Sequence, residues 1–191
     1  MRSRSLLLFA LPLFLCACAL SPQQVTVKPT LKPENSNIGE GRTLFVEVVD
    51  ERKSDVIGSR GGMYKDTSLI TLANDMPSAI REAAVKQFQS MGFKVQPNPG
   101  ASADIRIAVD TLSYGDPESS PVGFDVALEC VLRVEARQNG DTYNGRYQVK
   151  TTRTYATVPG RERNEEMINE TLSGALQRLF NDPKLLAFTL R

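Results

Sequence analysis

The chain has 191 residues, and its 23 lysines and arginines against 22 acidic residues give a formal net charge of +1. This balance provides no basic surface for nucleic acid, so we expect no nucleic-acid partner. The chain contains no histidine, which excludes Ser-His-Asp triads and Cys-His pairs and removes the commonest zinc ligand. Because no nucleotide-binding or metalloprotease motif is present either, the sequence predicts that the protein is not an enzyme, with no catalytic residue, metal site or cofactor.

The chain begins with the pattern of a bacterial lipoprotein signal. Two arginines precede an apolar run from Leu6 to Leu15, which is too short to span a bilayer and is typical of a secretory signal peptide. Ala17 supplies the small residue that lipoprotein processing requires before the modified cysteine, Cys18. The sequence therefore predicts a signal peptide over residues 1–17, cleavage between Ala17 and Cys18, and lipidation of Cys18. The alternative is an ordinary secretory leader with incidental cysteines.

Cleavage at this position removes 17 residues and leaves a mature chain of 174 residues with 21 basic and 22 acidic side chains. Cys16 leaves with the signal peptide and Cys18 is acylated, so Cys130 has no partner for an intrachain disulfide. The acyl chains predict attachment to a membrane. Because Ala19 is not the aspartate that resembles an inner-membrane retention signal in enterobacteria, we expect a lipid-anchored, periplasm-facing protein of the outer membrane.

Residues 18–41 are rich in Pro, Ser, Thr, Lys and Asn and contain few large apolar side chains. Such a composition cannot bury enough surface to order itself, so we predict a lipidated flexible tether with a reach on the order of 25 Å. The alternative is that Gln24–Val27 adds an edge strand. Residues 42–191 are long enough for one periplasmic domain with its own core.

The sequence of the first half of this domain predicts, in order, a strand, a long polar loop, a weaker strand, a helix and a short strand. Asp75 is a suitable N-cap for the helix, and Gly92 is placed to end it. In chain order, the elements are Leu44–Val49, Glu51–Met63, Ser68–Leu72, Met76–Met91 and Phe93–Val95.

The second half predicts three longer strands followed by a helix. Apolar and polar residues alternate over Ile105–Val109 and Val126–Ala136, and Asn139-Gly140 marks a tight hairpin turn before the return strand. A helix over Asn164–Phe180 and a short apolar tail complete the chain. The sequence thus predicts an α+β fold, with a mostly antiparallel sheet of four to five strands and two helices packed on one face. The element order is β-α-β-β-β-α.

Several short motifs occur in an order that resembles the YajG-like family of bacterial lipoproteins. A hydrophobic strand runs into a D-x-R element at Val48–Arg52, and a small-residue turn follows at Ile57-Gly58. The predicted helix then ends in the G-F-x-V motif of Gly92–Val95, and the hairpin follows at Asn139-Gly140. The resemblance covers nearly all of the mature chain. It implies a periplasm-facing outer-membrane lipoprotein without an assigned biochemical activity.

Asp50, Arg52 and Gly58 are the candidate partner-binding residues, because the loop after the first strand can present Arg52 to a protein or an anionic headgroup. In the structural interpretation, Arg52 pairs with Asp50 or a neighbouring carboxylate and Gly58 supplies a turn. The polar sheet face carries both signs of charge, which suits either a solvated surface or a docking surface. Its charged residues are Arg106, Glu129, Arg133, Glu135, Arg146 and Lys150.

We therefore expect a non-catalytic, lipid-anchored envelope lipoprotein that serves as a periplasmic interaction or accessory module for another envelope protein. One alternative is a carrier of a lipid or other hydrophobic ligand, which requires an apolar cavity between the helices and the sheet. Another is an enzyme that uses only carboxylates, which requires two acids to converge in a cleft. The acids on or near adjacent strands are Asp104, Asp110, Asp125 and Glu129.

Overall fold

The computed structural model describes residues 20–63 and 65–191, so the predicted processing site at Ala17 and Cys18 lies outside the described residues. Within these ranges the chain forms nine strands, three α-helices and one 3₁₀ helix, Lys65–Thr67. The helices are α1 (Met76–Ser90), α2 (Arg161–Phe180) and α3 (Pro183–Thr189). The strands are β1 (Gln23–Val25), β2 (Thr43–Asp50), β3 (Val56–Ser59), β4 (Leu69–Leu72), β5 (Lys94–Gln96), β6 (Ala103–Tyr114), β7 (Glu118–Ser120), β8 (Gly123–Gln138) and β9 (Asp141–Tyr155).

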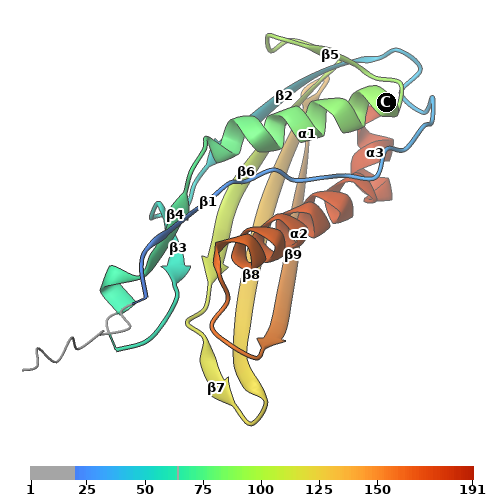
Figure 1. Cartoon of the computed structure of the whole chain (residues 1–191). Coiled ribbons are helices and arrows are strands. Elements are labelled where there is room, and N and C mark those ends of the chain that lie inside the picture. The colour runs from blue at the N-terminus through green and yellow to red at the C-terminus, as the bar shows by residue number, and fades with distance from the viewer. Residues whose placement is uncertain (1–19, 64) are drawn as a thin grey trace, which may run out of the picture.

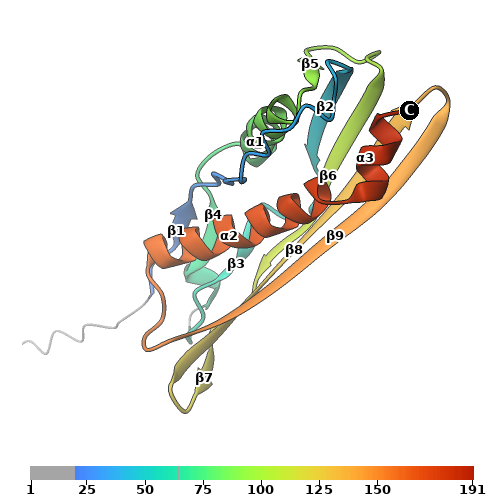
Figure 2. The same ribbon diagram turned by 90° about the vertical axis from the view of Figure 1, so that its right-hand side faces the viewer.

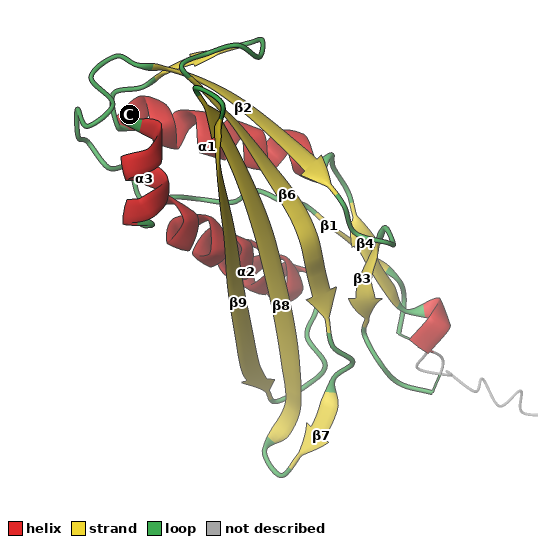
Figure 3. Ribbon diagram, turned by 180° about the vertical axis from the view of Figure 1, so that it is seen from behind, coloured by secondary structure: helices red, strands yellow, loops and turns green. Residues whose placement is uncertain are grey.

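The helices cover one face of a single sheet and leave its other face open (Figures 1 and 3). The long strands β6, β8 and β9 lie side by side and antiparallel. On the other side of β6, β2 pairs along the first part of the strand and β3 pairs near its end, both in parallel. The order then continues outward from β2 to β5 and from β3 through β4 to β1.

The predicted sheet of four to five mostly antiparallel strands with two helices is wrong. The chain between β2 and β6 crosses over through α1, so both β5 and β6 run parallel to β2. Three-residue β1 and four-residue β3 carry too few apolar residues to show a strand pattern, and β3 lies inside the segment predicted as a loop. The apolar tail forms a third helix, α3, which begins after the N-cap Asp182.

The two long helices and the hairpin form where the sequence predicts them. The Asp75 carboxylate accepts a hydrogen bond from the backbone N–H of Ser78 at 2.9 Å, and Pro77 occupies the first turn of α1. Gly92 ends this helix with φ of 88°. At the β8–β9 turn, Asn139 and Gly140 both have positive φ, 52° and 86°, as a tight hairpin turn requires.

Two clusters of buried side chains fill the space between the helices and the sheet. One lies mainly between α2 and strands β6 and β8, and the other lies where α1, α3 and the end of α2 meet β2 and β6. Phe88 of α1 and Phe180 of α2 are both fully buried, and their ring centroids are 4.8 Å apart. The two long helices therefore share one continuous interior, in which Cys130 is also buried.

A polar clamp holds α3 on the sheet. The hydroxyls of Tyr143 and Tyr147 on β9 donate to Asp182 Oδ2 at 2.5 and 2.7 Å, while Asp182 Oδ1 accepts from the backbone N–H of Lys184. Burial raises the pKa of the Asp182 carboxyl, but these hydrogen bonds outweigh it and hold the pKa below its usual value. The N-cap of α3 is thus tied to the edge strand.

Residues 20–41, predicted as most of a flexible tether, are packed on the domain. The alternative edge strand is present as β1, which pairs in parallel with β4. The chain then runs between α1 and α2 (Figure 2). The backbone N–H groups of Thr26, Lys28 and Thr30 donate to side chains one helical turn apart on α2, at Glu165, Asn169 and Ser173. Composition missed this segment because its partners are distant in the sequence, 47 residues away at β4 and Asn74 and about 140 residues away on α2.

Candidate partner-binding cleft

The sheet has a break where β2 ends and β3 begins. β2 follows β6 as far as the pair Asp50–Val109, and β3 rejoins it at the pair Gly58–Tyr114. Between these two points residues 51–55 leave the sheet, apart from one hydrogen bond at 3.0 Å from the backbone N–H of Glu51 to the backbone oxygen of Val109. Among the described strands, residues 111–113 of β6 therefore pair with β8 alone, and Asp110 pairs with no strand. The result is a cleft of about 480 Å³ between the departing segment and β6.

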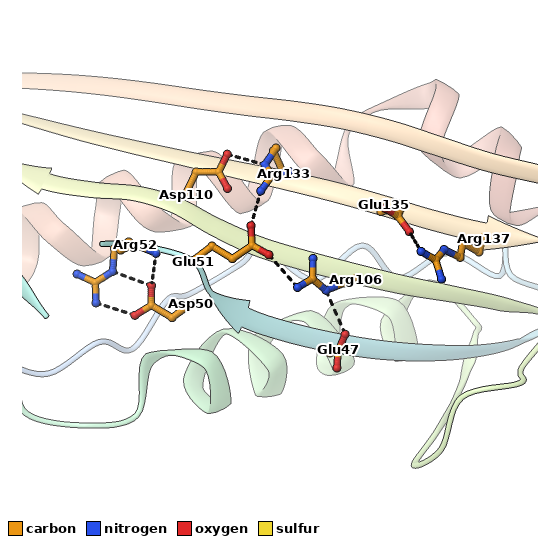
Figure 4. A network of polar contacts seen from close by, with 9 residues as sticks. All are labelled: Glu47, Asp50, Glu51, Arg52, Arg106, Asp110, Arg133, Glu135 and Arg137. Carbon is orange, nitrogen blue, oxygen red and sulfur yellow. Dashed lines mark hydrogen bonds and ion pairs between the residues drawn. The ribbon is translucent and has the colours of Figure 1, made fainter. Parts of the chain in front are cut away.

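Arg52, which is ion-paired with Asp50, lines one wall of this cleft. The Arg52 guanidinium binds the Asp50 carboxylate through two hydrogen bonds, Nε to Oδ1 at 2.9 Å and Nη2 to Oδ2 at 2.8 Å. The Arg52 side chain is only 6% exposed. Its third nitrogen, Nη1, is buried, has no hydrogen-bond partner and points away from Asp50 (Figure 4). The structural pairing expected from the sequence is present, and it leaves one buried donor unused.

Alternating charges line the open face of the sheet beside the break (Figure 4). Glu51 bridges Arg106 of β6, at 2.8 Å, and Arg133 of β8. Arg133 also donates from Nε to Asp110 Oδ2 at 2.6 Å, and Arg106 pairs with Glu47 of β2 at 3.3 Å. The hydrogen bond and charge of Asp110, with Glu51 contributing, raise the pKa of the Arg133 guanidinium. The network joins three strands across the break.

Asp110 stands at an irregularity of β6 opposite the break. The pairing with β8 shifts between Val109 and Thr111, which indicates a bulge. The second carboxylate oxygen of Asp110, Oδ1, is buried without a partner. The sequence carries a signal for this bulge that the prediction did not use, because the large apolar residues of β6 change from odd positions, Ile105 to Val109, to even positions, Leu112 and Tyr114.

Gly58 has a structural role that differs from the predicted turn. It lies inside β3, where a Cβ atom would fall 2.0 Å from the backbone oxygen of Tyr114. Only glycine permits this close approach of β3 to β6. Gly58 therefore positions the far end of the cleft without lining it.

The cleft offers unused hydrogen-bond capacity, and its lining includes one cation, Lys53, that forms no ion pair with a described residue. Asp50 matches the charge of Arg52, and Arg133 matches the charge of Asp110. What remains is a buried N–H donor on Arg52, a buried acceptor on Asp110 and the unpaired edge of four β6 residues. A peptide backbone carries both neutral donors and neutral acceptors, and an extended segment pairs with exposed strand edges.

The remaining charged residues of the open face are engaged with different partners. Glu129 binds Gln148 and Lys150, and Glu135 pairs with Arg137. The other acids considered for a carboxylate-only enzyme are also held separately, since Asp104 accepts from backbone N–H groups and Asp125 accepts from Thr154 at 2.6 Å. Within the described ranges, no group of three or more His, Cys, Asp and Glu residues is placed to hold a metal ion.

The space between the helices and the sheet does not favour a ligand carrier. The apolar side chains there pack against one another in the two core clusters. A cleft of about 460 Å³ lies instead between α1 and the N-terminal segment. Its lining mixes apolar residues such as Pro29, Leu31 and Ala79 with the charged side chains of Lys28, Glu82 and Lys86, and it lies outside the space in which a carrier was expected to hold its ligand.

Comparisons with known proteins define a class and a family. The family described as "Uncharacterized lipoprotein" (Lipoprotein_16) matches residues 29–189. The chain belongs to this lipoprotein family. In the described residues, no helix is long and apolar enough to cross a membrane. No curated protein matches the sequence at a significant level.

One solved structure shares the fold at low sequence identity, and two others are similar at lower TM-scores. Protein XCC0632 from Xanthomonas campestris is 15% identical with a TM-score of 0.50, and the match covers 90% of this chain and 93% of that one. The hypothetical protein CT253 from Chlamydia trachomatis is 9% identical over 78% and 96% of the two chains, with a TM-score of 0.39. Lipoprotein GNA1162 from Neisseria meningitidis is 14% identical over 74% and 99%, with a TM-score of 0.31.

Proposed function

We propose that this lipoprotein is a non-catalytic interaction module of the bacterial envelope. It is held by acyl chains on Cys18 at the periplasmic face of the outer membrane, and it binds an extended segment of another envelope protein. The motif order supports a closer relationship to the YajG-like family within this class. The lack of histidine and the separate pairing of the strand acids support a role without catalysis.

The single observation that carries the proposal is the break between β2 and β3. A bound segment would pair with the open edge of β6 at residues 110–113, while a backbone carbonyl would accept from Arg52 Nη1. A buried donor without an acceptor costs about 1–3 kcal/mol, and a ligand that supplies the acceptor recovers this free energy. The rest of the charged face would set the orientation of the partner.

The experiment is site-specific photo-crosslinking in intact envelopes. A photoreactive residue replaces Ser54 or Ser113, which line the cleft, or Thr152, an exposed control on β9. We expect one protein to be captured from both cleft positions and not from Thr152. Capture of the same proteins from all three positions would contradict the proposed site.

A second variant tests the part played by Arg52. Arg52→Gln removes Nη1 and should weaken capture at Ser54 about 10- to 100-fold, the equivalent of about 1.5–3 kcal/mol for a hydrogen bond from a charged group. Arg42→Gln, which breaks an exposed pair with Glu40, is the matched control. Because Arg52→Gln also releases Asp50, thermal unfolding of both variants must show that the domain is intact. Unchanged capture by a folded Arg52→Gln protein would refute the assigned role.

A further inference from the structure

The described chain starts at one end of the domain, next to the loop that follows β3. The Arg60 guanidinium donates from Nη1 to the backbone oxygen of Ser21 at 3.0 Å. A Cβ atom on Gly62 would lie 3.7 Å from Leu20 Cδ1. The described chain therefore begins beside the loop of residues 60–63, two positions after Cys18 in the sequence.

This end of the molecule also carries exposed apolar side chains. Among the described residues, three large apolar side chains are exposed: Ile38 at 39%, Val122 at 76% and Met63 at 89%. A single exposed apolar residue is ordinary for a protein surface. Here the two most exposed belong to the loop of residues 60–63 and to the tip of the β7–β8 hairpin. All three views place the hairpin and the start of the described chain toward the same end (Figures 1, 2 and 3).

Direct contacts join the Met63 loop to the base of the hairpin. Ser59 Oγ donates to Asp116 Oδ1 at 2.7 Å, and Lys65 pairs with the same carboxylate at 3.6 Å. A Cβ atom on Gly61 would fall 2.9 Å from Pro117 Cδ, so the two segments are in close packing. Gly61 and Gly62 have positive φ, and their turn leads the chain outward to Met63. The loop that carries Met63 and the hairpin that carries Val122 are thus joined at their bases and lie on one surface of the domain.

We propose that this end of the domain docks on the phospholipid leaflet that holds the Cys18 acyl chains, with Met63 and Val122 inserted at the lipid headgroups. The inference rests on the lipid anchor of the proposed function. The charged groups at this end carry both signs, with Arg60 and Lys65 opposed by Asp116 and Glu118, so apolar insertion supplies the attraction. The docking should therefore change little between low and high salt.

The test measures insertion depth in the lipidated chain. Met63→Cys and Val122→Cys are labelled with an environment-sensitive fluorophore, and Ile38→Cys, near the far end of α1, is the matched control. Cys18 is acylated and Cys130 is buried, so neither competes for the label. The proteins are reconstituted into vesicles of phosphatidylethanolamine and phosphatidylglycerol, with or without phosphatidylcholine that carries a spin-label quencher.

We expect the lipid quencher to reduce the emission of the labels at positions 63 and 122 and to leave the control label unchanged. Labels at 63 and 122 that stay as water-accessible as the label at 38, in protein that floats with the vesicles, would overturn the docking. Protein that carries no acyl group and does not float would instead overturn the anchor, and the docking inference with it.

A second measurement uses unlabelled protein and does not depend on the fluorophore. In the mature chain with Cys18→Ser, adding Met63→Ser and Val122→Ser together should weaken partition into the same vesicles about tenfold. Ile38→Ser, the control, should leave partition unchanged. Equal partition of the double variant and its parent would also overturn the proposal.

Discussion

The contact between Asn74 and Val27 is the sharpest test of how the N-terminal segment is held. Asn74 Nδ2 donates to the backbone oxygen of Val27 at 2.8 Å, and Asn74 Oδ1 accepts from the backbone N–H of the same residue at 2.8 Å. The Asn74 side chain thus satisfies both backbone groups of Val27, as the backbone of a neighbouring strand would. Because Val27 is only 1% exposed, the removal of Asn74 leaves a buried N–H and a buried C=O without partners.

Asn74→Ala should therefore destabilise the domain well beyond an ordinary surface substitution. Two lost hydrogen bonds contribute about 0.5–1.5 kcal/mol each, and part of the cost of leaving the buried groups unpaired adds to this. We expect a decrease of about 2–3 kcal/mol in the free energy of unfolding, or roughly 5–10 °C in melting temperature for a domain of this size. Urea unfolding of the mature chain with Cys18→Ser measures it.

Two comparisons make the result interpretable. Asn98→Ala, at an exposed loop position, should change the free energy of unfolding by less than about 0.5 kcal/mol. Hydrogen exchange at the Val27 amide should accelerate in Asn74→Ala and stay slow in the control. If Asn74→Ala matched the control in both stability and exchange, the reasoning that residues 20–41 are an integral part of the domain would be refuted.

Three further outcomes follow from single groups. As the pH falls below about 4, the stabilisation from the Asp182 carboxylate, whose native pKa is lowered, should be lost, and Asp182→Asn should flatten this decline in melting temperature. Burial raises the pKa of the Cys130 thiol to about 12. Thiol reagents at pH 8 should therefore label Cys130 only when urea unfolds the domain, and rapid labelling of the native protein would contradict this burial. Gly58→Ala should destabilise the domain by at least about 2 kcal/mol because its Cβ would meet a backbone oxygen. Gly174→Ala, inside α2, where a Cβ would make only ordinary contacts at 3.7 Å, should not.

The elements that the sequence predicted well are those whose signals are local. The capping carboxylate of Asp75, the Asn139-Gly140 turn and the alternation along β8 each act within a few residues, and each is present. The strand order was not accessible in this way. Whether β2 pairs with β6 in parallel depends on where α1 returns the chain, and nothing within β2 itself encodes that.

In the candidate cleft, too, local features could be predicted from the sequence and tertiary features could not. The D-x-R pattern predicts the pairing of Asp50 with Arg52, since two residues of separation bring the side chains together after a strand. The unused nitrogen of Arg52 and the buried oxygen of Asp110 depend on how β3 rejoins β6, which is a tertiary event. Sequence patterns identified the charged members of the site but not the hydrogen-bond capacity that makes it a cleft for a partner.

The two proposals concern neighbouring parts of one surface and can be separated by a single insertion. The first two residues of β3, Val56 and Ile57, line the cleft, and the last two lead into the loop that carries Met63, so about 7 Å of strand separates them. A partner bound at the break would therefore meet the domain close to the leaflet. Ten Gly/Ser residues inserted after Ser21 would lengthen the connection to Cys18 while leaving β1 and the cleft unchanged.

In that variant, we expect weaker lipid quenching at Met63 and Val122, because the anchor no longer holds them at the headgroups. Crosslinking at Ser54 should persist if the partner reaches the cleft from the periplasm. Loss of crosslinking together with loss of quenching would mean that the partner engages the cleft only while the domain is docked, which would make the leaflet part of the binding site.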